Sequence, residues 1–168
     1  MLPLRLYTYL LLDLDSAPDV LARMLRDITD PAAYDARPDP ARFTLREVLA
    51  HLADWEAVFL RRLTTTRDEE DGVLQGLDEG QVALDHDYAH ADPSECLARY
   101  KAGRTAIVSF LRALAPDQWQ RVGSHTEIGP ITLEAQAVLI AAHDGYHRQQ
   151  TLCHVSSDKV TWEVSGTE

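Results

Sequence analysis

Apolar residues recur at helical spacing along almost the whole of this 168-residue chain, whereas the alternation typical of strands is hard to find. Because the apolar face of each such helix must be buried against another element, this pattern favours helices packed on one another. We therefore expect an all-α protein. The clearest run of apolar positions is Leu45, Val48, Leu49, Leu52, Trp55, Phe59 and Leu63.

Turn and capping residues divide the chain into four helices joined by polar connections, which predicts a four-helix bundle. The second helix has the clearest start, because Thr44 is followed three residues later by Glu47, the pattern of a capping box. Residues 1–15 either extend the first helix or form an extended lead-in. The expected helices run from near Ser16 to Ile28, from Thr44 to about residue 63, from roughly Pro93 to Leu114 and from Thr132 to about Val155.

Residues 64–92 form a long connection between the second and third helices, rich in threonine and acidic residues and carrying three glycines. Loops longer than about 12–15 residues are uncommon in compact domains unless they serve a function such as a lid. We expect at most a short helical turn in this segment. A second connection, before Thr132, contains Trp119, Gly123 and His125.

The charge, the apolar runs and the cysteines of the chain limit its expected partners and location. The net charge of −11 disfavours nucleic-acid and anionic membrane partners, because such a field repels phosphate groups. No apolar run approaches the roughly 18 residues of a transmembrane helix, and no secretory signal is evident, so a cytoplasmic protein is expected. Cys96 and Cys153 stand alone without C-x-x-C spacing, and we expect buried or incidental thiols.

Three histidines have the spacing of a metal site. His143 and His147 lie four residues apart on one face of the expected fourth helix, where their side chains can converge on one ion. His51 lies on the apolar side of the second helix. On its own, His51 is more simply explained as a hydrogen-bonded core residue. Together, three neutral imidazoles from two helices form an open set of ligands suited to Zn²⁺, Ni²⁺ or Fe²⁺.

The other histidines have simpler explanations. His154 lies about 10.5 Å beyond His147 along the helix axis, which is too far to share an ion with His143. His86, His90 and His125 lie in the connections and are expected to be solvated surface groups. His86 or His90 reaches the site only if the long connection folds over it.

Acidic residues near the histidines are candidates for supporting roles. Asp54, three residues after His51, could act as a general base or an outer partner of the site. The simplest alternative places Asp54 and Glu56 on a solvated face. Asp144 points about 100° away from His143, so we expect it to serve as an outer partner or in a helix-surface pairing rather than as a ligand.

Several segments together resemble the DinB-like superfamily, a group of metal-binding four-helix bundles. The resemblance covers roughly residues 16–155, and the length of the chain predicts a single domain over residues 1–168. By position, the family's metal ligands fall on His51, His143 and His147. The segments that carry the resemblance are residues 42–56 around His51, Ala115-Pro-Asp-Gln-Trp119, Gly129-Pro-Ile-Thr-Leu133 and His143-Asp-Gly-Tyr-His147-Arg-Gln-Gln150.

The resemblance implies a divalent-metal enzyme that acts on a small-molecule substrate, in a homodimer. The activity that the resemblance favours is that of a thiol S-transferase, in which a low-molecular-weight thiol such as bacillithiol or mycothiol attacks a small electrophile. One alternative is a metal-dependent hydrolase with metal-activated water, in which Asp54 or a carboxylate from residues 64–92 serves as base. The other is a stress-related metal-binding protein without turnover.

Overall fold

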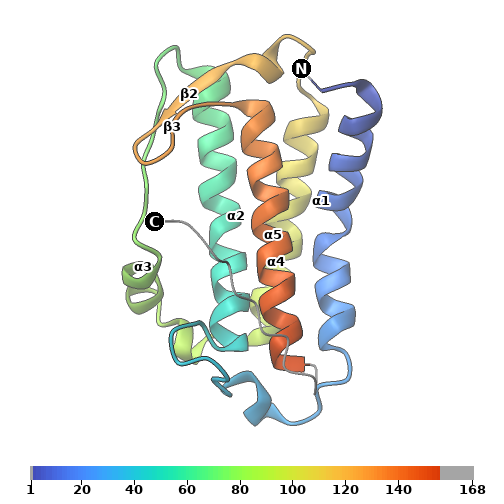
Figure 1. The fold of residues 1–168 in the computed structure, drawn as a ribbon, viewed down its shortest axis with the longest axis vertical. Coiled ribbons are helices and arrows are strands. Elements are labelled where there is room, and N and C mark those ends of the chain that lie inside the picture. Colours follow the sequence, from blue (N-terminus) through green and yellow to red (C-terminus); the bar gives the residue numbers. More distant parts are fainter. Residues whose placement is uncertain (1, 156–168) are drawn as a thin grey trace.

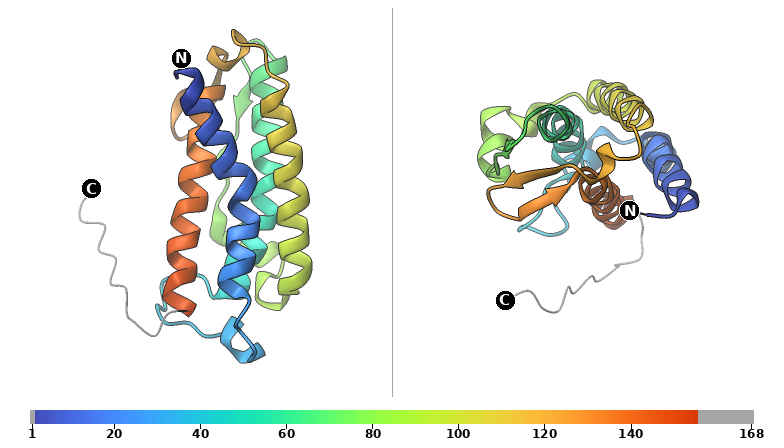
Figure 2. Two further views of the ribbon diagram at one scale, coloured as in Figure 1. Left: turned by 90° about the vertical axis from the view of Figure 1, so that its right-hand side faces the viewer. Right: turned by 90° about the horizontal axis from the view of Figure 1, so that it is seen from above.

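The computed structural model describes residues 2–155, in which four long helices pack side by side (Figure 1). Around the bundle their order is α1, α4, α2, α5, so that each helix contacts two others (Figure 2). The predicted all-α four-helix bundle is therefore confirmed. The bounds of the helices are Leu4–Leu25 for α1, Leu45–Asp68 for α2, Pro93–Arg112 for α4 and Leu133–Val155 for α5.

Three of the helix starts, those of α2, α4 and α5, are those predicted, and side-chain caps account for the first and the last. The Thr44 hydroxyl accepts a hydrogen bond from the Glu47 amide, and the Glu47 carboxylate accepts one from the Thr44 amide, which completes the capping box of α2. Thr132 caps α5 by accepting from the Ala135 amide at 3.0 Å. The predicted end of the second helix is too early, since α2 continues five residues beyond residue 63, to Asp68.

The predicted start of the first helix is wrong. Helix α1 begins at Leu4, so Ser16 and Pro18 lie inside it. Of the two alternatives for the segment before Ser16, the helical extension is correct, since residues 4–15 are helical. The Ser16 hydroxyl donates to the Asp13 carbonyl within the helix instead of capping a new one. Apolar packing stabilises this N-terminal part of α1, because Leu14 is fully buried and Tyr7, Leu10 and Leu11 pack against the core.

The segment between α2 and α4 returns the chain from one end of the bundle to the other, so that α2 and α4 run in the same direction (Figure 1). The short helical turn expected here is helix α3. This connection contains strand β1 (Val73–Leu74), helix α3 (Glu79–Asp85) and the 3₁₀ turn Tyr88–His90.

A small sheet, which the sequence did not predict, lies beside the upper part of α2 (Figure 1). Strand β2 (Val122–His125) pairs antiparallel with β3 (Gly129–Thr132), and β1 pairs parallel with β2. The turn of the hairpin uses Gly129, whose φ of 84° is readily adopted only by glycine. Strands of two to four residues are too short for the alternation of their side chains to stand out in the sequence.

A polar layer divides the core of the bundle into two apolar clusters. One cluster contains Leu14, Phe59 and Ile107, and the other contains Leu21, Leu49 and Tyr100. Between them, buried polar side chains come from three of the long helices. These side chains are His51, Glu56, Arg104, Asp144 and His147.

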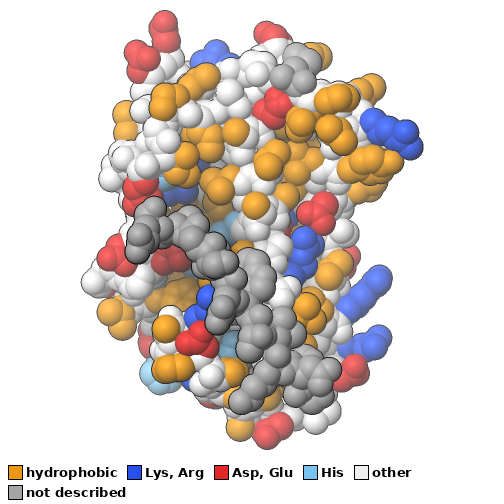
Figure 3. All heavy atoms as spheres, in the orientation of Figure 1, with side chains coloured by type: hydrophobic (Ala, Val, Ile, Leu, Met, Phe, Trp, Pro, Cys, Tyr) orange, Lys and Arg blue, Asp and Glu red, His pale blue; other side chains and the backbone are white. Residues whose placement is uncertain are grey.

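Exposed hydrophobic side chains gather over the upper part of α1 on the face shown in Figure 3; Leu4, Leu6, Tyr9 and Leu12 are the large ones. Within residues 2–155, none of the helices combines the length and the apolar character that a membrane span requires.

Candidate metal centre

Three imidazoles converge inside the bundle at the polar layer. His51 comes from α2, and His143 and His147 come from successive turns of α5. The Nε2 atom of His143 lies 2.9 Å from that of His51 and 3.2 Å from that of His147. Among residues 2–155, these three are the group of histidine, cysteine or acidic side chains that could hold a metal ion.

The arrangement fits a divalent ion. Two nitrogen ligands that each lie about 2.0–2.1 Å from one ion are themselves about 2.9–3.3 Å apart. All three potential ligand atoms lie within 4.8 Å of one another, so one ion can reach them together. Without an ion, three ring nitrogens that face one another can be satisfied only in part, because each neutral imidazole carries a single N–H.

Burial keeps the three imidazoles neutral, the state that binds metal. His51 is fully buried and His147 is 4% exposed. Loss of hydration lowers the pKa of His51 to about 3 and that of His147 to about 4. The pKa of His143 is lowered well below its usual value by burial and then by the neighbouring histidines.

Neighbouring side chains orient the imidazoles. The Nδ1 atom of His147 lies 3.0 Å from the Gln150 Oε1 atom, and the Gln150 amide also donates to the Phe43 carbonyl. Donation from Nδ1 leaves the Nε2 lone pair of His147 free to face the cluster. The Trp55 ring lies 4.2 Å from that of His51, between ring centroids, and packs against it.

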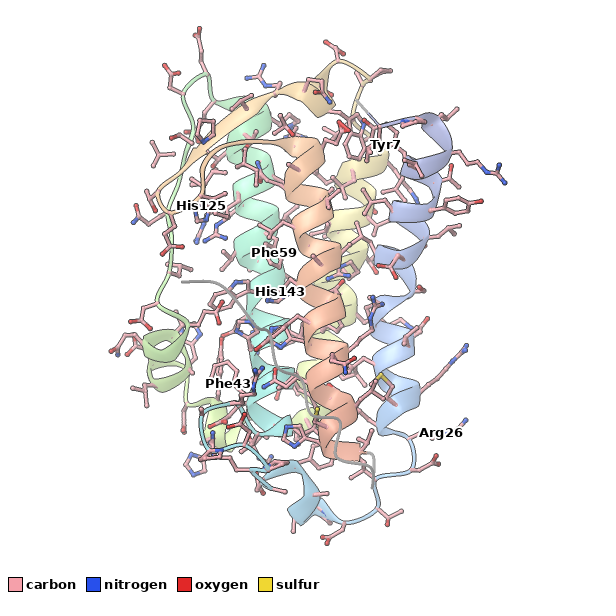
Figure 4. The ribbon with its side chains drawn as sticks, viewed as in Figure 1. Tyr7, Arg26, Phe43, Phe59, His125 and His143 are labelled. Carbon is pink, nitrogen blue, oxygen red and sulfur yellow. The ribbon has the colours of Figure 1, made fainter. Side chains whose placement is uncertain are left out.

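A cavity of about 160 Å³ reaches the centre at His143. Figure 4 shows Phe59 and His143 between α2 and α5, with His125 on the hairpin above them. Trp55, Phe59 and Leu139 form the apolar part of the wall next to His143. The remaining lining side chains are Arg62, Leu77, Glu79, His125, Glu127 and Ile128.

A family model described as the DinB superfamily matches residues 13–151, which include all three histidines. The chain belongs to this superfamily. The resemblance seen in the sequence is therefore confirmed.

Two proteins are similar to this one over most of its length. One, from Oceanobacillus iheyensis, is named "putative metal-dependent hydrolase" and is 27% identical over 145 residues, which are 86% of this chain and 81% of that protein. The other is YfiT from Bacillus subtilis, described as "a probable metal-dependent hydrolase with an unusual four-helix bundle topology". Its fold matches with a TM-score of 0.82 at 24% identity, over 92% of this chain and 86% of YfiT. At this identity, the similarity to YfiT establishes only that the two proteins share a fold.

In this DinB protein, His125 is not the solvated group that was expected. It is 4% exposed and lies in the wall of the cavity. Its Nδ1 atom accepts hydrogen bonds from the amides of Glu127 and Ile128, which leaves the ring proton on Nε2. The only signal in the sequence was its place two residues after Gly123 in a connection, which gives no indication of burial.

Asp54 lies outside the histidine cluster, and both of its carboxylate oxygens are engaged. They accept hydrogen bonds from Arg99 and from His86. Burial would raise the pKa of Asp54, but these hydrogen bonds outweigh it and lower the pKa. The long connection thus brings His86 to Asp54, whereas His90 bonds to Asp87 within the connection itself.

The two other acids are both buried. Glu56 is 2% exposed and lies in the polar layer, so the solvated face suggested for it is wrong. Asp144 is 1% exposed and contacts Arg104 and Tyr100, but it does not hydrogen bond to an imidazole. Neither Cys96, which is buried, nor Cys153 lines the cavity.

Proposed function

We propose that this DinB protein is a divalent-metal-dependent hydrolase whose small-molecule substrate binds in the cavity at His143. The observation that carries the proposal is the convergence of three neutral imidazoles on a point that the cavity reaches. The name of the relative from Oceanobacillus supports this reaction over thiol transfer. His51, His143 and His147 would hold the ion, which leaves positions for water and substrate, as catalytic zinc sites do.

An ion held there supplies an activated water and a Lewis acid for the substrate carbonyl. The protein's own residues then have separate tasks. Trp55 and Phe59 exclude bulk water from the side of the cavity next to His143. His125 lines the cavity and carries its proton on Nε2, because its Nδ1 accepts from backbone amides, so it would serve as a hydrogen-bond donor to a substrate there.

Glu79 is the better candidate for general base. It belongs to the 64–92 connection and lines the same cavity as His143, whereas Asp54 does not. Although Glu79 is exposed, partial loss of hydration where it lines the cavity raises its pKa, and the charges of Glu127 and Asp78 raise it further. A carboxylate with a raised pKa accepts a proton more readily near neutral pH. Asp54 is less suited to that task, because His86 and Arg99 already hydrogen bond to its two carboxylate oxygens.

Hydrolysis of 4-nitrophenyl acetate and butyrate by protein loaded with Zn²⁺, Ni²⁺ or Fe²⁺, without added thiol, tests this proposal. We expect His147→Ala to abolish the metal-dependent rate. Glu79→Gln should lower kcat by about 100-fold or more, the usual contribution of a general base. Glu70→Gln, which removes an exposed carboxylate from the same connection, is the matched control and should leave the rate unchanged.

The other outcomes separate the remaining possibilities. Turnover of an electrophile that appears only with bacillithiol or mycothiol would contradict hydrolysis and favour the thiol S-transferase. Metal binding without turnover in either assay would favour the stress-related binding protein. The thiol cofactor, the homodimer and the cytoplasmic location stay predictions that rest on the sequence.

A further inference from the structure

Arg104 of α4 is the centre of the polar layer, and all five of its N–H groups donate hydrogen bonds although the residue is 1% exposed. Nε donates to Glu56 at 3.0 Å, and Nη2 donates to Glu56 at 2.7 Å and to Asp144 at 2.9 Å. Nη1 donates to the second oxygen of Asp144 and, at 3.1 Å, to the carbonyl of Leu14. A single guanidinium therefore joins all four long helices.

The third partner of Arg104, the Leu14 carbonyl, is available because of Pro18. In an α-helix the carbonyl of residue 14 accepts from the amide of residue 18, and a proline in that place has no N–H. Pro18 lies inside α1, and Arg104 supplies the donor that the helix lacks. The bond from Arg104 thus uses the carbonyl group that Pro18 leaves without a partner.

This network lies at the height of the three histidines. Glu56 follows His51 by five residues on α2, and Asp144 follows His143 directly on α5. These are the two helices that carry the ligands, and Arg104 links them by binding both carboxylates. The Tyr100 hydroxyl donates to Asp144 at 2.9 Å and adds a second tie from α4 to α5. The separation of α2 and α5 at the histidines is therefore fixed by a buried ion network.

Both carboxylates of the network are buried and bind the guanidinium through two oxygens each. Two hydrogen bonds to a planar guanidinium fix the orientation of a carboxylate as well as its distance. Arg104 therefore holds α2 and α5 in a defined geometry next to the histidines.

We propose that Arg104, Glu56 and Asp144 are positioning residues of the metal centre: they hold α2 and α5 at the separation at which the three Nε2 atoms converge. The inference rests on the metal site of the proposed function but not on hydrolysis. The network touches neither substrate nor metal, so its effect is expected on the metal rather than on the reaction.

Competition with a chromogenic chelator for Zn²⁺ at pH 8 measures the effect. Glu56→Gln and Asp144→Asn keep the shape of each side chain and remove its charge. We expect each to weaken Zn²⁺ binding by about 10- to 100-fold, as changes of residues around metal ligands do. Asp19→Asn is the matched control, because it removes one carboxylate from an exposed α1–α4 ion pair with Lys101. It should leave the Zn²⁺ affinity unchanged.

Two further measurements separate positioning from general stability. The visible spectrum of Co²⁺-loaded protein reports the geometry of the ligands and should change in Asp144→Asn but not in Asp19→Asn. Urea unfolding of the metal-free variants identifies any that fail to fold. If one of the two carboxylate variants does not fold, the Zn²⁺ affinity of the other tests the inference. Zn²⁺ affinities within twofold of the control, with only the metal-free stability lowered, would overturn the inference.

The inference and the proposed function fail in different ways. Wild-type protein that binds Zn²⁺ but hydrolyses nothing contradicts the hydrolase and leaves this inference standing. Wild-type protein that binds no Zn²⁺, Ni²⁺ or Co²⁺ overturns both.

Discussion

At the scale of single residues, the decisive property of the candidate centre is that its histidines are held in the neutral form inside the bundle. Each imidazole has exchanged hydration for contact with aromatic rings, such as Trp55 on His51 and Phe59 on His143. The protonated form would therefore be strongly disfavoured in the folded state. In the unfolded chain the same side chains titrate near pH 6.5. Protonation of the histidines is thereby linked to folding.

This linkage predicts that metal-free protein loses stability as the pH falls below about 6.5. The folded pKa values lie below the unfolded one, so the unfolded state binds more protons and is favoured in acid. Each imidazole contributes about 1.4 kcal/mol to the loss between pH 7.5 and pH 5.5. Glu56 acts in the opposite sense, because its folded pKa is raised to about 7.

Comparison with a variant isolates the histidine contribution. In urea unfolding with EDTA, the free energy of unfolding of wild type should fall over this pH range by about 1.4 kcal/mol more than that of His51→Gln. His90→Gln, an exposed control, should behave as wild type does. Equal losses in wild type and His51→Gln would show that His51 titrates normally in the folded protein.

At the scale of elements, α1 shows where reasoning from the sequence fails and why. Ser16, Pro18 and Asp19 together have the composition of a helix start, because proline is favoured in the first turn. The proline lies in the middle of α1 instead, since a donor from another helix replaces its missing N–H. That donor is 86 positions away in the sequence, at Arg104, and no local pattern reveals it. The Thr44 and Thr132 caps were predicted because each depends only on residues within three positions.

This account of α1 predicts an unusual response to Pro18→Ala. Replacing a proline inside a helix ordinarily removes a penalty of about 3 kcal/mol. Here the backbone amide that alanine introduces at position 18 would compete with Arg104 for the Leu14 carbonyl and leave a buried N–H unpaired, which costs about 1–3 kcal/mol. We therefore expect a gain in the free energy of unfolding of less than about 2 kcal/mol. A gain near 3 kcal/mol in urea unfolding would show that the bond from Arg104 contributes nothing.

At the scale of the whole molecule, the bundle and its three histidines could be predicted, but the polar layer and the cavity could not. Helical spacing is a local property, and the pairing of His143 with His147 follows from helix geometry alone. Burial of Glu56 depends on a partner 48 positions away, and burial of His125 depends on a hairpin of short strands. Likewise, the parallel course of α2 and α4 follows from the path of the 69–92 connection, for which the sequence contains no directional signal.

The position of the polar layer makes metal binding a property of the entire fold. The layer separates two apolar clusters and joins the four long helices through Arg104, so an ion held by α2 and α5 stabilises their association directly. An ion that binds only the folded state raises the free energy of unfolding by about 2.7 kcal/mol at a concentration 100 times its Kd. In a chain of this length that corresponds to a rise in Tm of roughly 5–11 °C.

Thermal unfolding with Zn²⁺ and with EDTA should therefore differ by about this amount for wild type, and elemental analysis should find about one equivalent of metal. The double variant His143→Ala/His147→Ala should unfold at the same temperature in both conditions, because two of three ligands are gone. Equal Tm values for wild type in Zn²⁺ and EDTA would mean that the buried histidines hold no ion.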